Sequence, residues 1–245
     1  MTATTSPPNK AEIQEIKEIA IALAVKDFPT AIISEEFVRK NNIVDPDWKL
    51  TQAINRDDLA QLAFDSDVTI LARQNGIAFL ERVRGNDGQI KAQSAVDKCI
   101  CQLTGVAYQG LKIEAKRLIP IPNNGAARSY LSEFLVASGG WQNYGRSPVK
   151  TGINFLYDLG RCQLTMAISE ATIKQESKED AWTKDTGGLL FSGIFKYPPF
   201  KEGNTADEAK QAIANSQQDW QEFNQIIDRV FLNPEDSMLQ RILFA

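Results

Sequence analysis

The feature that most restricts the fold is a pair of β-rich runs, residues 68–74 and 77–83, separated only by Asn75-Gly76. An Asn-Gly pair supplies the two positive φ angles of a type I′ turn, whose twist matches that of antiparallel strands. The pattern therefore predicts a tight β-hairpin. Antiparallel hairpins beside helices argue against a parallel, Rossmann-type sheet.

Further strand signals follow the hairpin. A long strand is predicted over 106–119, ended by Pro120 and Pro122, and another over 187–197, ended by Pro198-Pro199. A second hairpin is predicted from residues 152–157 and 161–169. Three other segments are less regular: 11–26 is expected to be a short helix running into a strand, 49–65 a connecting segment or a short helix, and 172–186 a mobile loop anchored by Trp182.

Apolar residues at helical spacing predict amphipathic helices over 89–103, 125–136 and 205–232. Ser34 is a predicted N-cap for a short helix closed by Asn41-Asn42, and Asn233-Pro234 is expected to begin a last short helix. Meandering strands with flanking helices are typical of an α+β fold, in which an antiparallel sheet is covered by helices.

The length of 245 residues fits one α+β domain over 1–245 or two fused halves, 1–138 and 139–245, with residues 1–10 as a loose tail. Hairpin, strand and helix occur between 68 and 137 and again between 152 and 232. Thr104-Gly105-Val106 also echoes Thr151-Gly152-Ile153. We therefore consider a tandem duplication of a hairpin–strand–helix unit about a pseudo-twofold axis.

Charge and cysteine content restrict the partners. The net charge of −4 argues against general nucleic-acid binding, which requires a basic excess. Residues 104–150 nevertheless carry a net +4 from six basic and two acidic residues, which fits solvated element faces, a surface for an anionic ligand, or a self-complementary surface for oligomer formation. Three scattered cysteines, the absence of a signal-peptide pattern and the short longest apolar run, 19–25, lead us to expect a cytoplasmic, non-membrane protein.

The sequence contains no histidine, which excludes Ser-His-Asp and Cys-His catalysis and every histidine metal site. Neither a dinucleotide-binding glycine motif nor a P-loop occurs. Cys99 and Cys101 lack the further ligands that a structural zinc site needs, so we expect no metal and no cofactor. Carboxylates remain as acid–base groups, but the sequence does not show the unlike environments that would separate their pKa values.

Two segments are candidate ligand sites. Asn124 and Arg128 lie at the start of the predicted helix 125–136, where free N–H groups and a cation could hold an anion; ordinary helix capping is the alternative. Trp141, Tyr144 and Arg146 lie in a glycine-rich loop that could stack on a ligand, or that is pinned to the core by its aromatic residues. No catalytic residue is assigned.

The first third of the chain resembles uncharacterised bacterial and cyanobacterial proteins. The resemblance lies in residues 29–37, Asn42-Ile43-Val44 and Asp47-Trp48, followed by Asn75-Gly76-Ile77-Ala78-Phe79. Those proteins carry an N-P-x-x-L-T-P-E-F-L…G-I-V-x-x-x-W pattern before an N-x-I-x-F hairpin. Here Ser34-Glu35 stands in place of Thr-Pro and Asn42 in place of Gly. The resemblance covers about the first third of the chain and implies no activity or site residue.

Three functions remain open at this level. We expect a non-catalytic binding or interaction protein that self-associates, because catalytic motifs are missing from a chain with a full-sized core. The alternatives are an enzyme using carboxylate, tyrosine or lysine chemistry on a small anionic substrate anchored by Arg128 and Arg146, and a structural subunit of a larger assembly.

Overall fold

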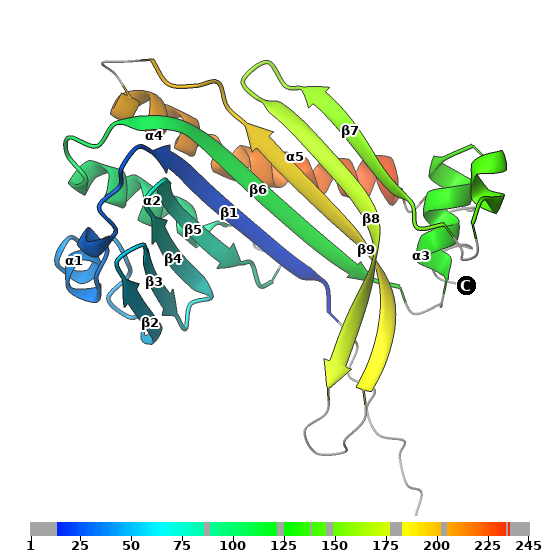
Figure 1. Ribbon diagram of the computed structural model, residues 1–245, viewed down its shortest axis with the longest axis horizontal. Coiled ribbons are helices and arrows are strands. Elements are labelled where there is room, and N and C mark those ends of the chain that lie inside the picture. The colour runs from blue at the N-terminus through cyan, green and yellow to red at the C-terminus, as the bar shows by residue number, and fades with distance from the viewer. Residues whose placement is uncertain are drawn as a thin grey trace, which may run out of the picture.

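A computed structural model describes residues 14–85, 89–121, 125–137, 139–145, 149–176, 183–201, 205–233 and 235. Its centre is a nine-stranded, fully antiparallel sheet with the order β2-β3-β4-β5-β1-β6-β9-β8-β7 (Figure 1). The α+β fold with a helix-covered antiparallel sheet is therefore confirmed. The strands are β1 (Ile16–Val25), β2 (Leu50–Arg56), β3 (Leu59–Phe64), β4 (Val68–Arg73), β5 (Gly76–Arg82), β6 (Tyr108–Pro120), β7 (Gly152–Asp158), β8 (Gln163–Glu176) and β9 (Thr183–Lys196).

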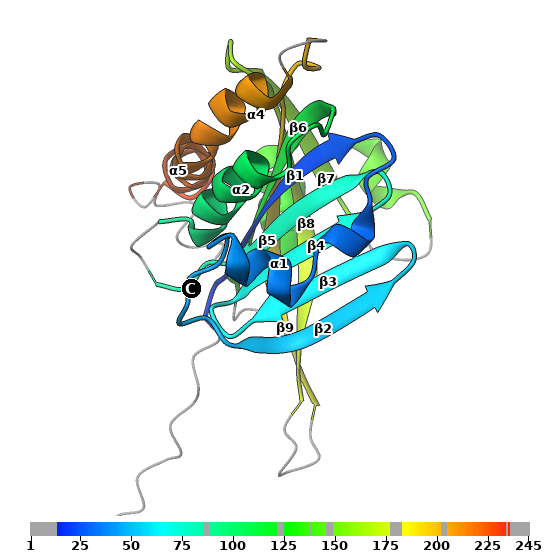
Figure 2. The same ribbon diagram turned by 90° about the vertical axis from the view of Figure 1, so that its left-hand side faces the viewer.

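The helices α2 (Lys91–Gln102), α4 (Thr205–Ala214) and α5 (Ser216–Ile226) lie on one face of the sheet (Figure 2). Each has an apolar stripe, and Val96, Ile213 and Phe223 are fully buried against the sheet. Glu81 on β5 caps the N-terminus of α2, because its carboxylate accepts a hydrogen bond from the N–H of Ala92 at 2.9 Å. The opposite face of the sheet carries none of these helices.

The central strand β1 shows why the two faces differ. Ile19, Ile21 and Leu23 are buried beneath the helices, because alternate side chains of a strand point to opposite faces. Ala20 and Ala22 alternate with them and point to the uncovered face. Pairing of β1 with β5 on one side and with β6 on the other places this alanine row in the middle of the sheet.

The two parts of the chain share an order of elements. β1 is followed by α1 (Glu35–Lys40), by a meander whose last strand returns to β1, and by α2; β6 is followed by α3 (Ala126–Ser129), by a meander whose last strand returns to β6, and by α4 and α5. The predicted repeat unit grouped the β4–β5 hairpin with β6. In the structure β6 pairs with β1 and β9 and not with that hairpin. A duplication stays a prediction.

The hairpin of β4 and β5 is confirmed, but its turn is not type I′. Arg73 pairs directly with Gly76, so Gln74 and Asn75 form the turn, and neither has a positive φ. Gly76, with φ of 153°, is needed for a different reason: a Cβ there would lie 2.2 Å from the carbonyl oxygen of Leu23 on β1.

Several irregular segments are more regular than predicted. Residues 49–65 form β2 and β3, and most of 172–186 extends β8 and β9, so the predicted connecting segment and mobile loop are wrong; Trp182 lies outside the described residues. Long cross-strand ladders satisfy the backbone of these polar runs, which periodicity alone does not reveal. Residues 16–25 are strand, and the start of the predicted helix there lies outside the described part.

Two helix predictions need correction. The helix predicted over 205–232 consists of α4, α5 and the π-helical turn η4 (Ile227–Phe231), with a break at Asn215. The helix predicted over 125–136 is present, but it consists of α3 followed directly by the π-helical turn η2 (Tyr130–Leu135), which buries Tyr130 and Leu131. The helix expected after Asn233-Pro234 lies outside the described residues.

Candidate functional site

Small side chains hollow out the middle of the uncovered sheet face. Ala22 on β1 is flanked by Ala78 on β5 and by Lys112 on β6, and the next level has Ala24 between Gly76 and Gly110. A row of methyl groups and hydrogens between longer neighbours leaves a depression over β1. The register of three strands, two of them far apart in the chain, therefore creates the site.

Two hollows on this face are described here, and the larger one has a volume of about 490 Å³. Its floor is the alanine and glycine row of β1, β5 and β6, and Leu71 on β4 adds an apolar wall. Among the described residues, three cations line it, Arg73, Lys112 and Lys196, and no Asp or Glu does. The volume lies within the range of about 300–1,000 Å³ that is typical of small-molecule sites, and an apolar floor with a few polar groups fits that class.

Two of these cations face each other across neighbouring strands. Lys112 on β6 and Lys196 on β9 are direct register partners, and both are exposed. Like charges placed directly opposite one another destabilise a sheet. Lys112 forms an ion pair with Glu114 at 2.5 Å, whereas the side chains of Lys196 and Arg73 form no ion pair or hydrogen bond with the described residues. The local field therefore favours an anion.

A second hollow, of about 250 Å³, lies further along β1 and has a mixed lining. Here Glu18 on β1 is the register partner of both Arg82 on β5 and Lys116 on β6. Glu114 and Asp67 add negative charge to this lining. Opposite charges lie beside each other, so this hollow lacks the uncompensated positive charge of the larger one.

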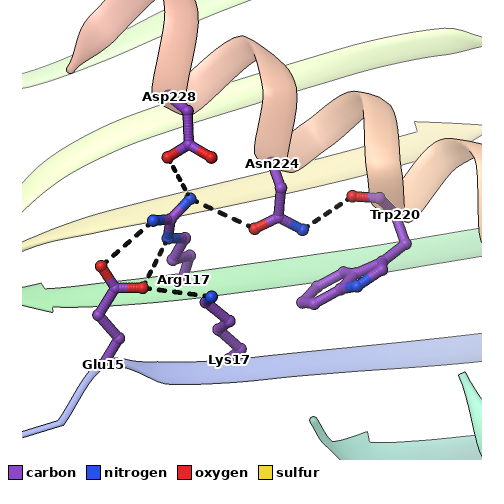
Figure 3. Close-up of polar contacts among 6 residues, drawn as sticks. All are labelled: Glu15, Lys17, Arg117, Trp220, Asn224 and Asp228. Atoms are coloured by element: carbon purple, nitrogen blue, oxygen red, sulfur yellow. Dashed lines mark hydrogen bonds and ion pairs between the residues drawn. The ribbon is translucent and has the colours of Figure 1, made fainter. Parts of the chain in front are cut away.

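The cluster around Arg117 lies on the helix-covered side and is fully paired. Arg117, 7% exposed, donates to Glu15 at 3.0 and 3.2 Å and to Asp228 at 2.7 Å (Figure 3). Burial disfavours the charged guanidinium, but these carboxylates outweigh it and raise the pKa of Arg117. Lys17 forms an ion pair with Glu15, and the side-chain oxygen of Asn224 accepts a hydrogen bond from Arg117 (Figure 3). The cluster ties β1 and β6 to the last helical turns.

Asp219 and Glu222 form the carboxylate pair that could suggest acid–base catalysis. Asp219 is completely buried, and burial raises its pKa against the hydrogen bonds from Tyr197 and Arg161. Its Oδ1 accepts from Arg161 at 2.5 Å and its Oδ2 from Tyr197 at 2.6 Å. Arg161 also binds Glu222 at 2.5 Å. Neither carboxylate lines the two hollows described above, and their hydrogen bonds tie α5 to Arg161 and Tyr197.

The two buried cysteines are not activated nucleophiles. Cys99 and Cys162 are buried, and burial raises the pKa of their thiols to about 12 and about 11. Cys101 is exposed. Within the described residues, no group of three or more Asp, Glu or Cys side chains could hold a metal ion.

The residues predicted as a ligand site are described only in part, so that site stays a prediction. Arg128 is engaged by Glu170 in a two-pronged ion pair at 2.9 and 3.2 Å. Trp141 is 37% exposed and donates to the carbonyl of Ala137, and Tyr144 is 88% exposed. Asn124 and Arg146 lie outside the described residues. None of the hollows described above is lined by Arg128, Trp141 or Tyr144.

Sequence reasoning missed Arg73 and Lys196, and it recorded Lys112 only as one charge in the basic stretch 104–150. The available signal was the alternation of alanine with large aliphatic residues in β1, which marks a face carrying only small side chains. That signal does not reveal which cations stand beside the alanines, because they come from other strands.

No protein-family model matches the sequence, and no curated protein matches it. Among the helices of the described residues, none combines the length and the apolar character needed to cross a membrane. The site on the uncovered sheet face is therefore interpreted from its own geometry and charge.

Proposed function

We propose that this chain is a non-catalytic binding protein that holds a small organic anion in the larger hollow of the uncovered sheet face. The observation that carries the proposal is the Lys112–Lys196 pair, directly opposite across β6 and β9 at the border of an alanine-lined hollow. An anionic group beside this pair would be attracted by Lys196 and by the part of the Lys112 charge that Glu114 does not offset, and it would relieve their mutual repulsion.

The shape of the site indicates the rest of the ligand. Ala22, Ala24 and Ala78 offer an apolar floor beside the lysines, and Leu71 offers a wall. A ligand with a carboxylate or phosphate and a compact apolar body can contact both parts, and its burial against the floor adds about 25 cal/mol per Å² of apolar surface. Arg73 stands at the β4 side of the hollow, where it can reach a second acceptor.

The absence of chemistry in the same hollow favours binding over catalysis. No carboxylate, tyrosine hydroxyl or thiol in this lining is free to act on a bound molecule: Tyr197 lines the hollow, but its hydroxyl donates to Asp219. Burial raises the pKa of Tyr197 well above its ordinary value, and its hydrogen bond to Asp219 adds to this. The charged side chains in this lining are ammonium and guanidinium groups, which hold anions.

The test is a thermal-shift screen with organic carboxylates and organic phosphates in matched pairs, each at constant ionic strength. A ligand at 100 times its Kd stabilises the fold by about 2.7 kcal/mol, which corresponds to roughly 5–10 °C for a chain of this size. We expect Lys196→Gln to abolish the shift and Lys116→Gln, in the other hollow, to preserve it. If no anion raises the melting temperature, or if both variants respond like the unmodified protein, the proposal is wrong.

A further inference from the structure

Within the described residues, the edge strand β7 (Gly152–Asp158) has no strand paired with its outer side. It ends the sheet order of this part of the chain, where its only strand partner is β8 (Figure 1). Within the described residues, no backbone hydrogen bond outside the β7–β8 ladder involves residues 152–158. Such a row of free N–H and C=O groups is a template for pairing with another strand.

The other end of the sheet shows what is missing beside β7. In the shared order of elements, β3 occupies the place in the first meander that β7 occupies in the second, and β3 is flanked by the further strand β2. With β2 beside it, β3 keeps its core-facing residues Ala60, Leu62 and Phe64 at most 4% exposed. The second meander has three strands where the first has four, so β7 lacks an equivalent neighbour.

The core consequently reaches the molecular edge at β7. Ile153, Phe155 and Tyr157 point to the helix-covered side but remain only partly buried. The Phe155 ring packs against Phe231, with centroids 5.2 Å apart, so it continues the main core. On the other face Leu156 is 68% exposed. Both faces of the strand therefore present apolar surface beside a free backbone edge.

β7 also lacks the residues that usually keep an edge strand single. Its sequence, Gly-Ile-Asn-Phe-Leu-Tyr-Asp, contains no lysine, arginine or proline. The opposite edge, β2, exposes Gln52, Asn55 and Arg56 and is interrupted by a register shift near Leu50. Charges and irregular pairing on an edge discourage association. The two edges of the same sheet are thus protected to different degrees.

We propose that β7 pairs with β7 of a second copy of this chain, antiparallel and centred on Phe155, to form a twofold-symmetric dimer. This register places Asn154 opposite Leu156 and Ile153 opposite Tyr157 of the second copy. Asp158, the only charged residue of the strand, lies opposite Gly152, so no like charges meet. A strand that is complementary to itself in this way fits an interface that uses the same patch on both subunits.

The proposed dimer rests on the edge geometry and is independent of anion binding. Pairing joins the two sheets into one continuous sheet and brings the partly exposed Ile153, Phe155 and Tyr157 of both copies together, which extends both cores across the twofold axis. The hollow at Lys112 and Lys196 lies over β1, β5 and β6, away from β7 in the strand order, and stays open.

The test uses two exposed positions, Asn154 and Leu156, that are opposite each other in the proposed register. The double variant Asn154→Lys with Leu156→Lys places lysine against lysine twice. Its matched control, Asn154→Lys with Leu156→Glu, places lysine against glutamate at the same two places. Sedimentation equilibrium over a concentration series measures the mass of each protein, and far-UV circular dichroism verifies that each variant folds.

We expect the unmodified chain and the lysine–glutamate control to approach twice the monomer mass with increasing concentration, and the double-lysine variant to remain monomeric. A monomeric unmodified chain at every soluble concentration would overturn the proposal. A double-lysine variant that dimerises like the unmodified chain, or a lysine–glutamate control that remains monomeric while folded, would overturn the register. Each result is separate from the anion screen, so the two proposals fail independently.

Discussion

Removing one lysine of the candidate site should stabilise the free protein. Lys196→Gln eliminates the charge directly opposite Lys112 across β6 and β9, while Lys116→Gln, on the same face of β6, eliminates a charge opposite Glu18. The first change removes a repulsion and the second an attraction. The two variants are therefore expected to change the free energy of unfolding in opposite directions.

The size of the effect follows from the register. A direct cross-strand charge pair contributes about 0.2–1 kcal/mol, favourable or unfavourable according to sign. Glu114 lies 2.5 Å from Lys112 and offsets part of its repulsion of Lys196, and Arg82 shares Glu18 with Lys116. We therefore expect about 0.2–0.5 kcal/mol in each direction, and a difference of about 0.5–1 kcal/mol between the two variants.

Urea denaturation at low ionic strength is the suitable measurement, because urea carries no charge that would screen the lysines. Transition midpoints are compared directly, since extrapolated free energies carry an uncertainty of about 10–15%. The buffer must be free of organic anions, which would occupy the proposed site. The difference between the variants should shrink in salt of about 1 M, where the Debye length falls to about 3 Å.

The reasoning is refuted if Lys196→Gln lowers the midpoint at low salt, or if both variants shift it in the same direction. A difference that does not respond to salt would show that packing rather than charge separates them. The expected result would mean that free Lys196 lowers stability, as is common for residues whose role is to bind.

Other predictions concern the fold. Gly76→Ala should lower the free energy of unfolding by about 2–5 kcal/mol, from backbone strain and overpacking against the Leu23 carbonyl; an unchanged urea midpoint would contradict this. Burial raises the pKa of Glu81, so the folded state holds its proton more tightly than the unfolded state and stability is lost as pH rises above about 4.5. The Glu81→Gln variant should therefore become more stable relative to the unmodified protein as the pH rises between about 4 and 7. If this difference in unfolding free energy instead decreases with rising pH, the inferred direction of the Glu81 pKa shift is wrong. Tyr130→Phe leaves the Phe231 carbonyl without its donor at 2.7 Å and should cost about 1–3 kcal/mol in calorimetry, whereas Ser132→Ala, at a partly exposed position, should cost less.

Local patterns were sufficient for some elements and not for others. The hairpin at Asn75-Gly76 and the helix α2 were predictable because turn residues and apolar spacing lie within a few positions of one another. The strand β2, in the first half of 49–65, was missed because it is an edge strand with little burial, so its sequence carries no alternation. The end of β8 was missed because its polar residues are held by pairing with β9 rather than by the core.

The candidate site was less predictable than the fold. The glycine-rich loop with Trp141 and Tyr144 has the composition of a binding loop, but its described residues lie apart from the hollows described here. Arg128, chosen for its place near a helix start, is engaged by Glu170, a residue of β8. Composition marks residues that can bind, and only the surrounding charges decide which of them are already paired.

The sequence by itself determined that the chain forms antiparallel strands with flanking helices, and that no histidine chemistry is available to it. Alternation along β1 even marks a face of small side chains, because period-two patterning is a local property of a strand. Only the tertiary structure decided that β1 lies in the middle of the sheet, that Lys112 meets Lys196, and that β7 is left at the edge. Strand order and register are set by the burial of the whole core against the helices. They depend on contacts between distant parts of the chain, so no single segment of sequence determines them.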